Sequence, residues 1–528
     1  MSYRPSQNPS YWASDFKLVA EDSEFLQDYL QNRERPALES DLVQALVEAR
    51  FRREDQRIRR ELARGAVYQP QSSYQVGQTL VFPHLDFAAG TVEAIRPGRN
   101  PEHGDFDVLA VTLEPTEKPR YFAASLKSAH KLNLPPGDAG LANEAITGPT
   151  EILERHGREL RNRLREQLLA LTPAPFVNLG RYWSLAGLLA DVHEGHVNIA
   201  EAAVDISGKP LNTGEILAQV GLPREVAPAL AAFSMDLALS QDERFVDIGV
   251  ESREWYLERL MPEEAIAAPR RLQYTAESYD RTVLPVPLLQ LEWSLNDEWG
   301  ESNVSTPNSV RLTQVDLALI YPHRRSGTLP LGDRTASFFP VRDGKRSLVT
   351  FVDGRWGKRF TGWVVPEERY VCGLGEWYEE HGIPVGGYIV LERTDVPNEV
   401  IIDLKPHRSK REWVRMALVE GNHLKFQMQK HTIACDYDET MIVAEADAAA
   451  TDDLRRRSYR QNVSIRELVD ELAPQLMGLS TQGTVHAKTV YSAINLLHRA
   501  APGPVFAALL TNPRFQALGM AEFCMARV

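Results

Sequence analysis

Three segments in the middle of the chain decide the fold: GTLPLGDRTASFFP (residues 327–340), LVTFVDGRWGKRFTGW (348–363) and YVCGLGEWYEEHGIPVGGYIVLER (370–393). Runs of apolar and aromatic residues between Gly- and Pro-containing turns are typical of short β-strands. Further strand-like runs extend over residues 275–445, which also hold six of the nine tryptophans. Seven expected strands, SFFPV (337–341) among them, and a short helix at GEWYEEHG predict a closed barrel or sandwich. We expect residues 280–440 to fold alone.

These segments resemble the plant B-three-type DNA-binding pseudobarrel over about residues 324–393. The matching features are the Phe339-Pro340 pair, the Asp353-Gly354 turn, a helix entered through Gly375 and Trp377, and a glycine turn before the last strand. The resemblance implies a β-pseudobarrel that contacts double-stranded DNA.

The distribution of charge favours the same function independently of the resemblance. Residues 321–365 contain nine Arg or Lys against three Asp, whereas residues 366–400 contain eight acids and two Arg. Basic strand-and-loop surfaces bind phosphate, and guanidinium groups also read guanine edges. A second basic cluster surrounds Trp413, which could stack on a base. The alternatives are a mutually neutralised surface and a Trp413 that packs inward. The candidate DNA-binding residues are Arg324, Arg325, Arg334, Arg342, Lys345, Arg346, Arg355, Lys358, Arg359, Lys405, Arg408, Lys410 and Arg411.

Four further segments flank this β domain. We expect a helical N-terminal arm (1–70), a small SH3-like β-barrel (71–135), a helical, winged-helix-like region (147–270) and a second one at the C-terminus (453–528). In residues 180–262 the order helix, helix, turn, helix and β-wing resembles the HARE-type winged helix-turn-helix modules. A generic helical bundle is the alternative. The predicted fold class is therefore multidomain α+β.

Bulk composition excludes some classes of protein. The chain has 528 residues and a net charge of −13, which argues against coating nucleic acid along its whole length. Cys372, Cys435 and Cys524 are too scattered for a disulfide framework or a Cys-x-x-Cys zinc site. Without an apolar run of membrane-spanning length or a signal core, we expect a cytoplasmic protein with no membrane association and no small-molecule substrate.

Two partial catalytic motifs occur. Asp436-x-Asp438-x-Thr440 resembles the first motif of haloacid-dehalogenase phosphatases, but the residues after it read as helices instead of the alternating strands and helices of that fold. Asp403-Leu404-Lys405 matches half of a restriction-type nuclease core and has no second acid at an earlier strand end. We therefore expect no catalytic residues, no metal and no cofactor. The favoured function is double-stranded DNA binding by a transcription or genome-defence regulator; the alternatives are a protein-interaction scaffold and, more distantly, a metal-dependent nuclease.

Overall fold

In the computed structural model the chain forms a mixture of helices and sheets, grouped into two compact units. One unit comprises residues 1–193 and 221–237, and the other comprises residues 194–220 and 238–528. The multidomain α+β organisation expected from the sequence is confirmed. Within the part of the chain that is described, no helix is long and apolar enough to cross a bilayer. The described residues are 6, 11–114, 118–133, 148–222, 225–301, 312–340, 344–442 and 444–526.

The first unit is organised around a helical core closed by a small sheet. Trp12, Leu46, Leu164 and Trp183 pack together in this core, although they come from distant parts of the chain. The strand before α2 pairs with the last strand of a hairpin that follows α3, giving the sheet order β1-β8-β7. In chain order the elements are α1 (Ala20–Gln31), β1 (Ala37–Leu38), α2 (Glu39–Leu62), α3 (Pro149–Leu169), β7 (Phe176–Leu179) and β8 (Tyr182–Leu185).

A five-stranded sheet is inserted between α2 and α3 and has a core of its own. Its strands follow one another in sequence order, and Leu80, Val92 and Val111 lie at its centre. Residues 149–185, on the far side of this insertion in the chain, pack with the N-terminal helices. This grouping differs from the expected division into segments 1–70 and 147–270. The strands are β2 (Ala66–Val67), β3 (Thr79–Phe82), β4 (Ala88–Pro97), β5 (Asp107–Leu113) and β6 (Pro119–Ala124).

The same order of elements occurs twice more along the chain. In each copy a helix is followed by a short strand, two helices and a hairpin, and the short strand pairs with the last strand. The second copy contains α4 (Glu194–Ser207), β9 (Leu211–Asn212), α5 (Thr213–Val220), α6 (Pro228–Gln241), β10 (Phe245–Asp247) and β11 (Glu254–Leu257). The third contains α12 (Ile465–Met477), β22 (Thr484–His486), α13 (Ala487–Leu497), α14 (Pro502–Thr511), β23 (Phe515–Gly519) and β24 (Glu522–Met525).

A short sequence pattern marks the hairpin in all three copies. Phe-x-x-Leu/Ile-Gly occurs at residues 176–180, 245–249 and 515–519. Its glycine adopts a positive φ in the first and third copies, at 62° and 98°. In the second copy a Cβ on Gly249 would lie 1.8 Å from the carbonyl oxygen of Ser252. The turn therefore requires glycine in each copy, either because its φ is positive or because a Cβ has no space.

A seven-stranded sheet forms the centre of the second unit, with the order β12-β17-β18-β14-β15-β16-β13. β14 and β18 are parallel, and the other neighbouring strands are antiparallel. The stretch expected as a strand at SFFPV contains a 3-10 turn (Ala336–Phe338), whose Phe338 is buried. The elements are β12 (Gln314–Ala318), α9 (Tyr321–Ser326), β13 (Thr328–Pro330), β14 (Ser347–Asp353), β15 (Arg359–Val365), β16 (Tyr370–Cys372), α10 (Gly375–Glu380), β17 (Tyr388–Arg393) and β18 (Glu399–Leu404).

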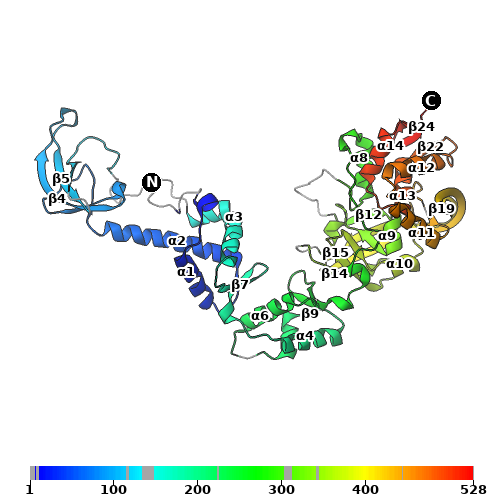
Figure 1. Ribbon diagram of the computed structural model, residues 1–528, viewed down its shortest axis with the longest axis horizontal. Helices are drawn as coiled ribbons and strands as arrows, with labels where there is room; N and C mark the ends of the chain where they lie inside the picture. Colours follow the sequence, from blue (N-terminus) through cyan, green and yellow to red (C-terminus); the bar gives the residue numbers. More distant parts are fainter. Residues whose placement is uncertain are drawn as a thin grey trace. The chain divides into compact units, whose positions relative to one another are not determined.

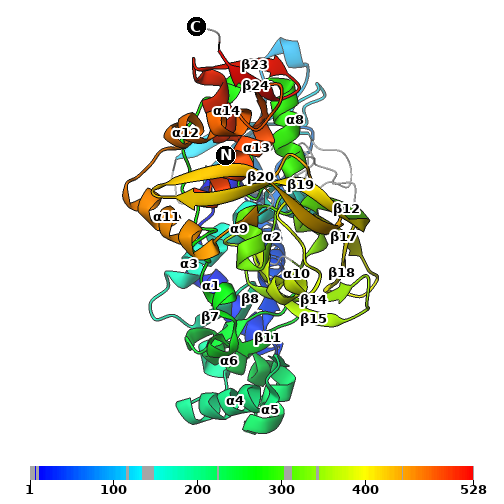
Figure 2. The same cartoon turned by 90° about the vertical axis from the view of Figure 1, so that its right-hand side faces the viewer.

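A long hairpin connects this sheet with the C-terminal helices (Figures 1 and 2). Val414 and Met416 pack on the core of the sheet, whereas Ala417 and Phe426, nearer the turn, pack on the helices. The ribbon thus contributes to holding the sheet and the C-terminal copy of the repeated module together. The remaining elements of the second unit are α7 (Glu263–Ile266), α8 (Val286–Leu295), β19 (Pro406–Glu420), β20 (His423–Cys435), β21 (Ala444–Glu445) and α11 (Ala448–Arg460).

Candidate nucleic-acid interface

Most of the basic residues expected to bind DNA are already bonded within the protein. Arg334 donates to the carbonyl of Asp316 and lies over the ring of Trp293, and Arg342 lies outside the described residues. Most of the positive charges in residues 321–365 are therefore neutralised by ion pairs within the protein. The ion pairs are Arg324–Glu379 (2.9 Å), Arg325–Glu445 (3.3 Å), Lys345–Asp247 (2.8 Å), Arg346–Glu367 (3.7 Å), Lys358–Glu380 (2.6 Å), Arg359–Glu399 (2.8 Å) and Lys405–Asp316 (2.7 Å).

The turn between β14 and β15 is fixed by the buried carboxylate of Asp353. One oxygen accepts the backbone N–H groups of Arg355 and Trp356, and the other accepts from Trp377 at 2.9 Å and from His381 at 2.6 Å. Burial would raise the pKa of Asp353, but these hydrogen bonds, His381 first, lower it overall. Trp356 stacks on the His381 ring at 4.1 Å, so the turn has one defined conformation.

Arg355 is the cation that this turn leaves available. Its side chain is exposed, and in the described part of the chain no carboxylate lies within 4 Å of it. The neighbouring Lys358 and Arg359 are paired with acids from α10 and β18. Only one of the three cations expected to act in this loop is therefore presented to solvent without a counter-charge.

The β19–β20 hairpin brings together the second basic cluster. Its register pairs Arg411 with Thr432 and Trp413 with Lys430, and directly opposed residues lie on the same face of an antiparallel ribbon. The Lys430 ammonium lies 5.1 Å from the centre of the Trp413 ring, which is 60% exposed. Met428, opposite Arg415, extends this exposed face. The ribbon thus carries an aromatic ring flanked by cations on its outer side.

The cations on this part of the ribbon are free of acidic partners. Arg408, Lys410 and Arg411 are exposed, and among the described residues none of them has a carboxylate within 4 Å. The register shifts between Pro406 and Lys410, so Arg408 lies in an irregular stretch of the strand. We name Arg408, Lys410, Arg411, Trp413 and Lys430 the ribbon cluster.

Sequence reasoning found the β19 half of the ribbon cluster and missed the β20 half. Lys430 and Met428 carry no motif of their own and join the cluster only through the strand register. The available signal was the Gly421-Asn422 turn between two runs with alternating apolar residues, a pattern typical of a hairpin.

The residues of the partial catalytic motifs serve local structure. Asp438 forms an ion pair with Lys488 at 2.6 Å and accepts from Thr440, and Asp403 accepts the backbone N–H of Leu404. Burial raises the pKa of the Cys435 thiol to about 11, so this thiol stays protonated at neutral pH and is a poor metal ligand. Among the described residues, no three His, Cys, Asp or Glu side chains are grouped to hold a metal ion.

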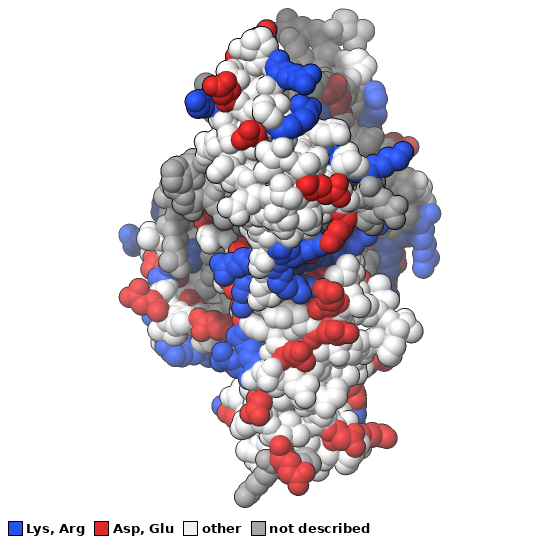
Figure 3. Space-filling view, turned by 90° about the vertical axis from the view of Figure 1, so that its left-hand side faces the viewer, with Lys and Arg blue, Asp and Glu red and all other residues white. Residues whose placement is uncertain are grey.

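On the face drawn in Figure 3, basic and acidic side chains are interspersed among uncharged areas. On this face the positive charge lies beside acidic side chains and does not form one continuous basic surface. Comparisons of the chain with protein-family models, with curated proteins and with solved structures found no match.

Proposed function

We propose that the protein binds double-stranded DNA, with the ribbon cluster as its main contact surface. The single observation that carries this proposal is the exposed Trp413, flanked on one face of the ribbon by Arg411 and Lys430, which have no acidic partner in the described part of the chain. Lys410 on the other face and Arg408 beyond the register shift are likewise unpaired among the described residues, in a protein of net charge −13. Phosphate is the counter-ion that such a surface fits.

The geometry of the ribbon supports duplex recognition. A two-stranded antiparallel ribbon fits the major groove, which is about 12 Å wide. β19 and β20 pair continuously from Lys410 to the turn, and among the described residues the other strand that pairs with β19, β21, meets it at Met416 and Ala417 and not at Trp413. Arg411 and Lys410 point to opposite faces of the ribbon, so one reaches base edges while the other reaches a phosphate.

The fold of the surrounding domains belongs to the same proposal. We assign the seven-stranded sheet domain to the B-three-type pseudobarrels, the five-stranded insert to SH3-like barrels, and the three repeated modules to winged helices. Each of these folds presents a rigid surface to nucleic acid or protein, which suits a cytoplasmic regulator of transcription or genome defence.

A protein-interaction scaffold is the second candidate, and a specific observation favours it. On α4, Ile206 is 87% exposed and Ile199 is 43% exposed. These residues are seven positions apart and therefore lie on one face of the helix. An exposed apolar stripe of this kind marks a docking site for another protein.

The test of DNA binding is a fluorescence anisotropy titration of labelled duplexes at several salt concentrations. For the full chain, we expect log K to fall linearly with log salt, and Arg411→Gln and Lys430→Gln each to reduce the slope by about one unit. Trp413→Ala weakens binding without changing the slope, because it removes packing and no charge.

The double variant K425Q/E420Q is the matched control, since Lys425 lies on the same strand as Lys430 but is paired with Glu420 near the turn, and deleting the pair as a unit exposes no new carboxylate. We expect it to bind as the unmodified chain does. Binding without salt dependence, or equal losses in K425Q/E420Q and Lys430→Gln, would remove DNA as the ligand and leave the scaffold as the preferred function.

A further inference from the structure

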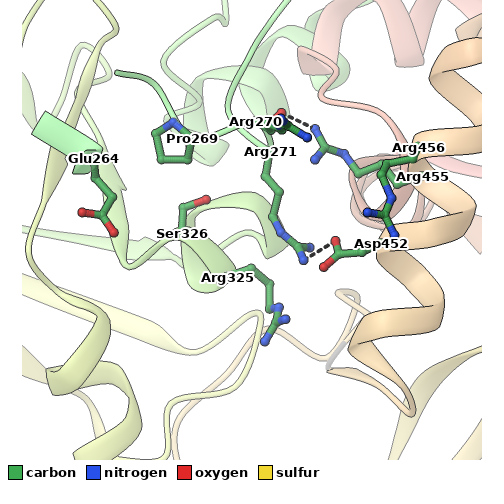
Figure 4. Close-up of a pocket in the computed structure, with 9 residues that line it drawn as sticks. All are labelled: Glu264, Pro269, Arg270, Arg271, Arg325, Ser326, Asp452, Arg455 and Arg456. Carbon is green, nitrogen blue, oxygen red and sulfur yellow. Dashed lines mark hydrogen bonds and ion pairs between the residues drawn. The ribbon is translucent and has the colours of Figure 1, made fainter. Parts of the chain in front are cut away.

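A cavity of about 360 Å³ in the second unit is lined by arginines from three separate segments. Arg270 and Arg271 follow α7, Arg325 lies in the last turn of α9, and Arg455 and Arg456 lie on α11. Figure 4 shows these side chains around one space, with Arg271 directed toward Asp452. The lining contains only two acids, Glu264 and Asp452, so its formal charge is positive.

Two of these arginines have no acidic partner in the described part of the chain. Arg455 is 8% exposed, and one of its nitrogens donates to the backbone carbonyl of Arg270 at 2.6 Å. Its other N–H groups have no hydrogen-bond partner among the described residues, and neither does the exposed guanidinium of Arg270. The Arg455 guanidinium also lies 5.1 Å from the centre of the Tyr459 ring, a contact that leaves its charge without an anion, so this arrangement favours an anion in the cavity.

A hydroxyl group adds a second unsatisfied site in the same lining. The Oγ atom of Ser326 is buried and has no partner among the described residues. A serine hydroxyl donates to phosphate oxygens, and the planar arginine fork pairs with them in a bidentate way. The cavity therefore offers both types of donor that hold a phosphate group.

We propose that this cavity binds a phosphate monoester. Its volume is at the lower end of small-molecule sites, which start at about 300 Å³. It accommodates the phosphate and part of the group that carries it. The phosphate belongs either to a free small molecule such as a nucleotide or to the 5′ end of a nucleic acid. This site is separate from the ribbon cluster, and the inference does not depend on duplex binding.

The experiment is isothermal titration calorimetry of the full chain at constant ionic strength. The probes are adenosine 5′-monophosphate, adenosine, inorganic phosphate, and a short duplex with either a 5′-phosphate or a 5′-hydroxyl. We expect a dissociation constant of about 1 mM or tighter for at least one phosphomonoester, and none measurable for adenosine. The probe that binds more tightly, nucleotide or 5′-phosphorylated end, identifies the source of the phosphate.

The variants separate the site from general charge effects. Arg455→Met and the double variant R270Q/R456Q are expected to weaken binding at least about ten-fold. The double variant changes only exposed side chains, so it tests the site even if Arg455→Met fails to fold. Arg460→Gln, also exposed and on α11 but outside the cavity, is the matched control and should bind within about two-fold of the unmodified chain.

Phosphomonoester binding that is lost in R270Q/R456Q and kept in Arg460→Gln would establish the site. The inference is overturned by the absence of binding to every phosphorylated probe, or by equal losses in Arg460→Gln. Equal affinity for the 5′-phosphate and 5′-hydroxyl duplexes, with binding of the nucleotide, would assign the phosphate to a free small molecule. Trp413→Ala should leave the calorimetric result with the nucleotide unchanged, so failure of DNA binding and failure of this site are distinguishable.

Discussion

Arg499 and Glu298 lie 201 residues apart in the chain and form an ion pair of 2.6 Å with both side chains buried. The same guanidinium contacts Asp297 at 2.9 Å, and the opposite oxygen of Glu298 bonds to His323 at 3.0 Å. The cluster therefore links the segment after α8, helix α9 and the segment between α13 and α14. It joins the C-terminal helical module to the sheet domain by charge as well as by apolar packing.

Removing Arg499 should destabilise the second unit strongly. Arg499→Met leaves two buried carboxylates without their partner, and we expect a loss of about 3–5 kcal/mol in the free energy of unfolding. Urea denaturation followed by tryptophan fluorescence measures this. The triple variant D297N/E298Q/R499M carries no buried charge at these positions and should recover part of the loss. A triple variant less stable than Arg499→Met would contradict this account of the cluster.

Stability should also fall in acid because of Glu298. Burial alone would raise the pKa of Glu298, but Arg499 and His323 outweigh it and lower the pKa to about 2. The folded pKa lies below the ordinary value of 4.5, so the contribution of Glu298 is complete above about pH 4.5 and is lost as the pH falls toward 2.

Unfolding free energies of the unmodified chain and of Glu298→Gln, measured from pH 7 to pH 3, test this expectation. The variant is less stable at pH 7, and the difference between the two proteins should shrink below pH 4.5. Glu420→Gln, which removes an exposed acid, serves as the control and should give a difference that changes little with pH. Parallel curves for Glu298→Gln would mean that the carboxylate contributes nothing through its charge.

The contacts of the β19–β20 hairpin change the expectation for isolated fragments. Residues 280–440 were expected to fold alone, yet Ala417, Leu424 and Phe426 are buried against helices of residues 465–509. We now predict that a fragment ending at residue 445, which lacks these helices, is unfolded or aggregated. A fragment of residues 262–528, which includes them, should unfold cooperatively. Circular dichroism with urea titration of both fragments is the measurement, and a cooperative transition in the shorter fragment would contradict the prediction.

Local features of the fold followed well from the sequence. Asn212 and Glu215 have the spacing of a capping box, and each side chain accepts the other residue's backbone N–H, at 3.0 and 2.8 Å. The strands expected within residues 348–363 are observed as β14 and β15. Such patterns depend on residues that are close together in the sequence, so they can be recognised without knowing the fold.

Long-range relationships did not follow. The sequence left open whether the charge of residues 321–365 is neutralised. Acids of residues 366–400, such as Glu380 and Glu399, supply several of the partners, whereas Asp247, the partner of Lys345, comes from a distant segment. The first repeated module was hidden because a β domain separates its second and third helices. The Phe-x-x-Leu/Ile-Gly pattern would have revealed all three copies, since the turn that it encodes needs glycine each time.

The turn at residues 353–359 offers a test of which cations face DNA. Arg355 has no acidic partner in the described part of the chain, whereas Lys358 and Arg359 are held by Glu380 and Glu399. If the turn contacts a phosphate, Arg355→Gln should weaken binding to all duplexes alike and lower the log–log salt slope by about one unit. If Arg355 reads guanine instead, only duplexes with that base lose affinity.

The paired cations need a charge-balanced comparison, because removing a lysine alone exposes a new carboxylate to the DNA. The double variants K358Q/E380Q and R359Q/E399Q delete each ion pair as a unit, and we expect their affinities to stay within about two-fold of the unmodified chain. Anisotropy titrations of all three proteins over a range of salt, with specific and scrambled duplexes, make the comparison. Affinity that is unchanged in Arg355→Gln would show that this turn is a solvated surface and that DNA contact is confined to the ribbon cluster. A loss in the double variants as large as in Arg355→Gln would mean that the ion pairs open when DNA binds, and the basic half of the sheet domain would then belong to the interface.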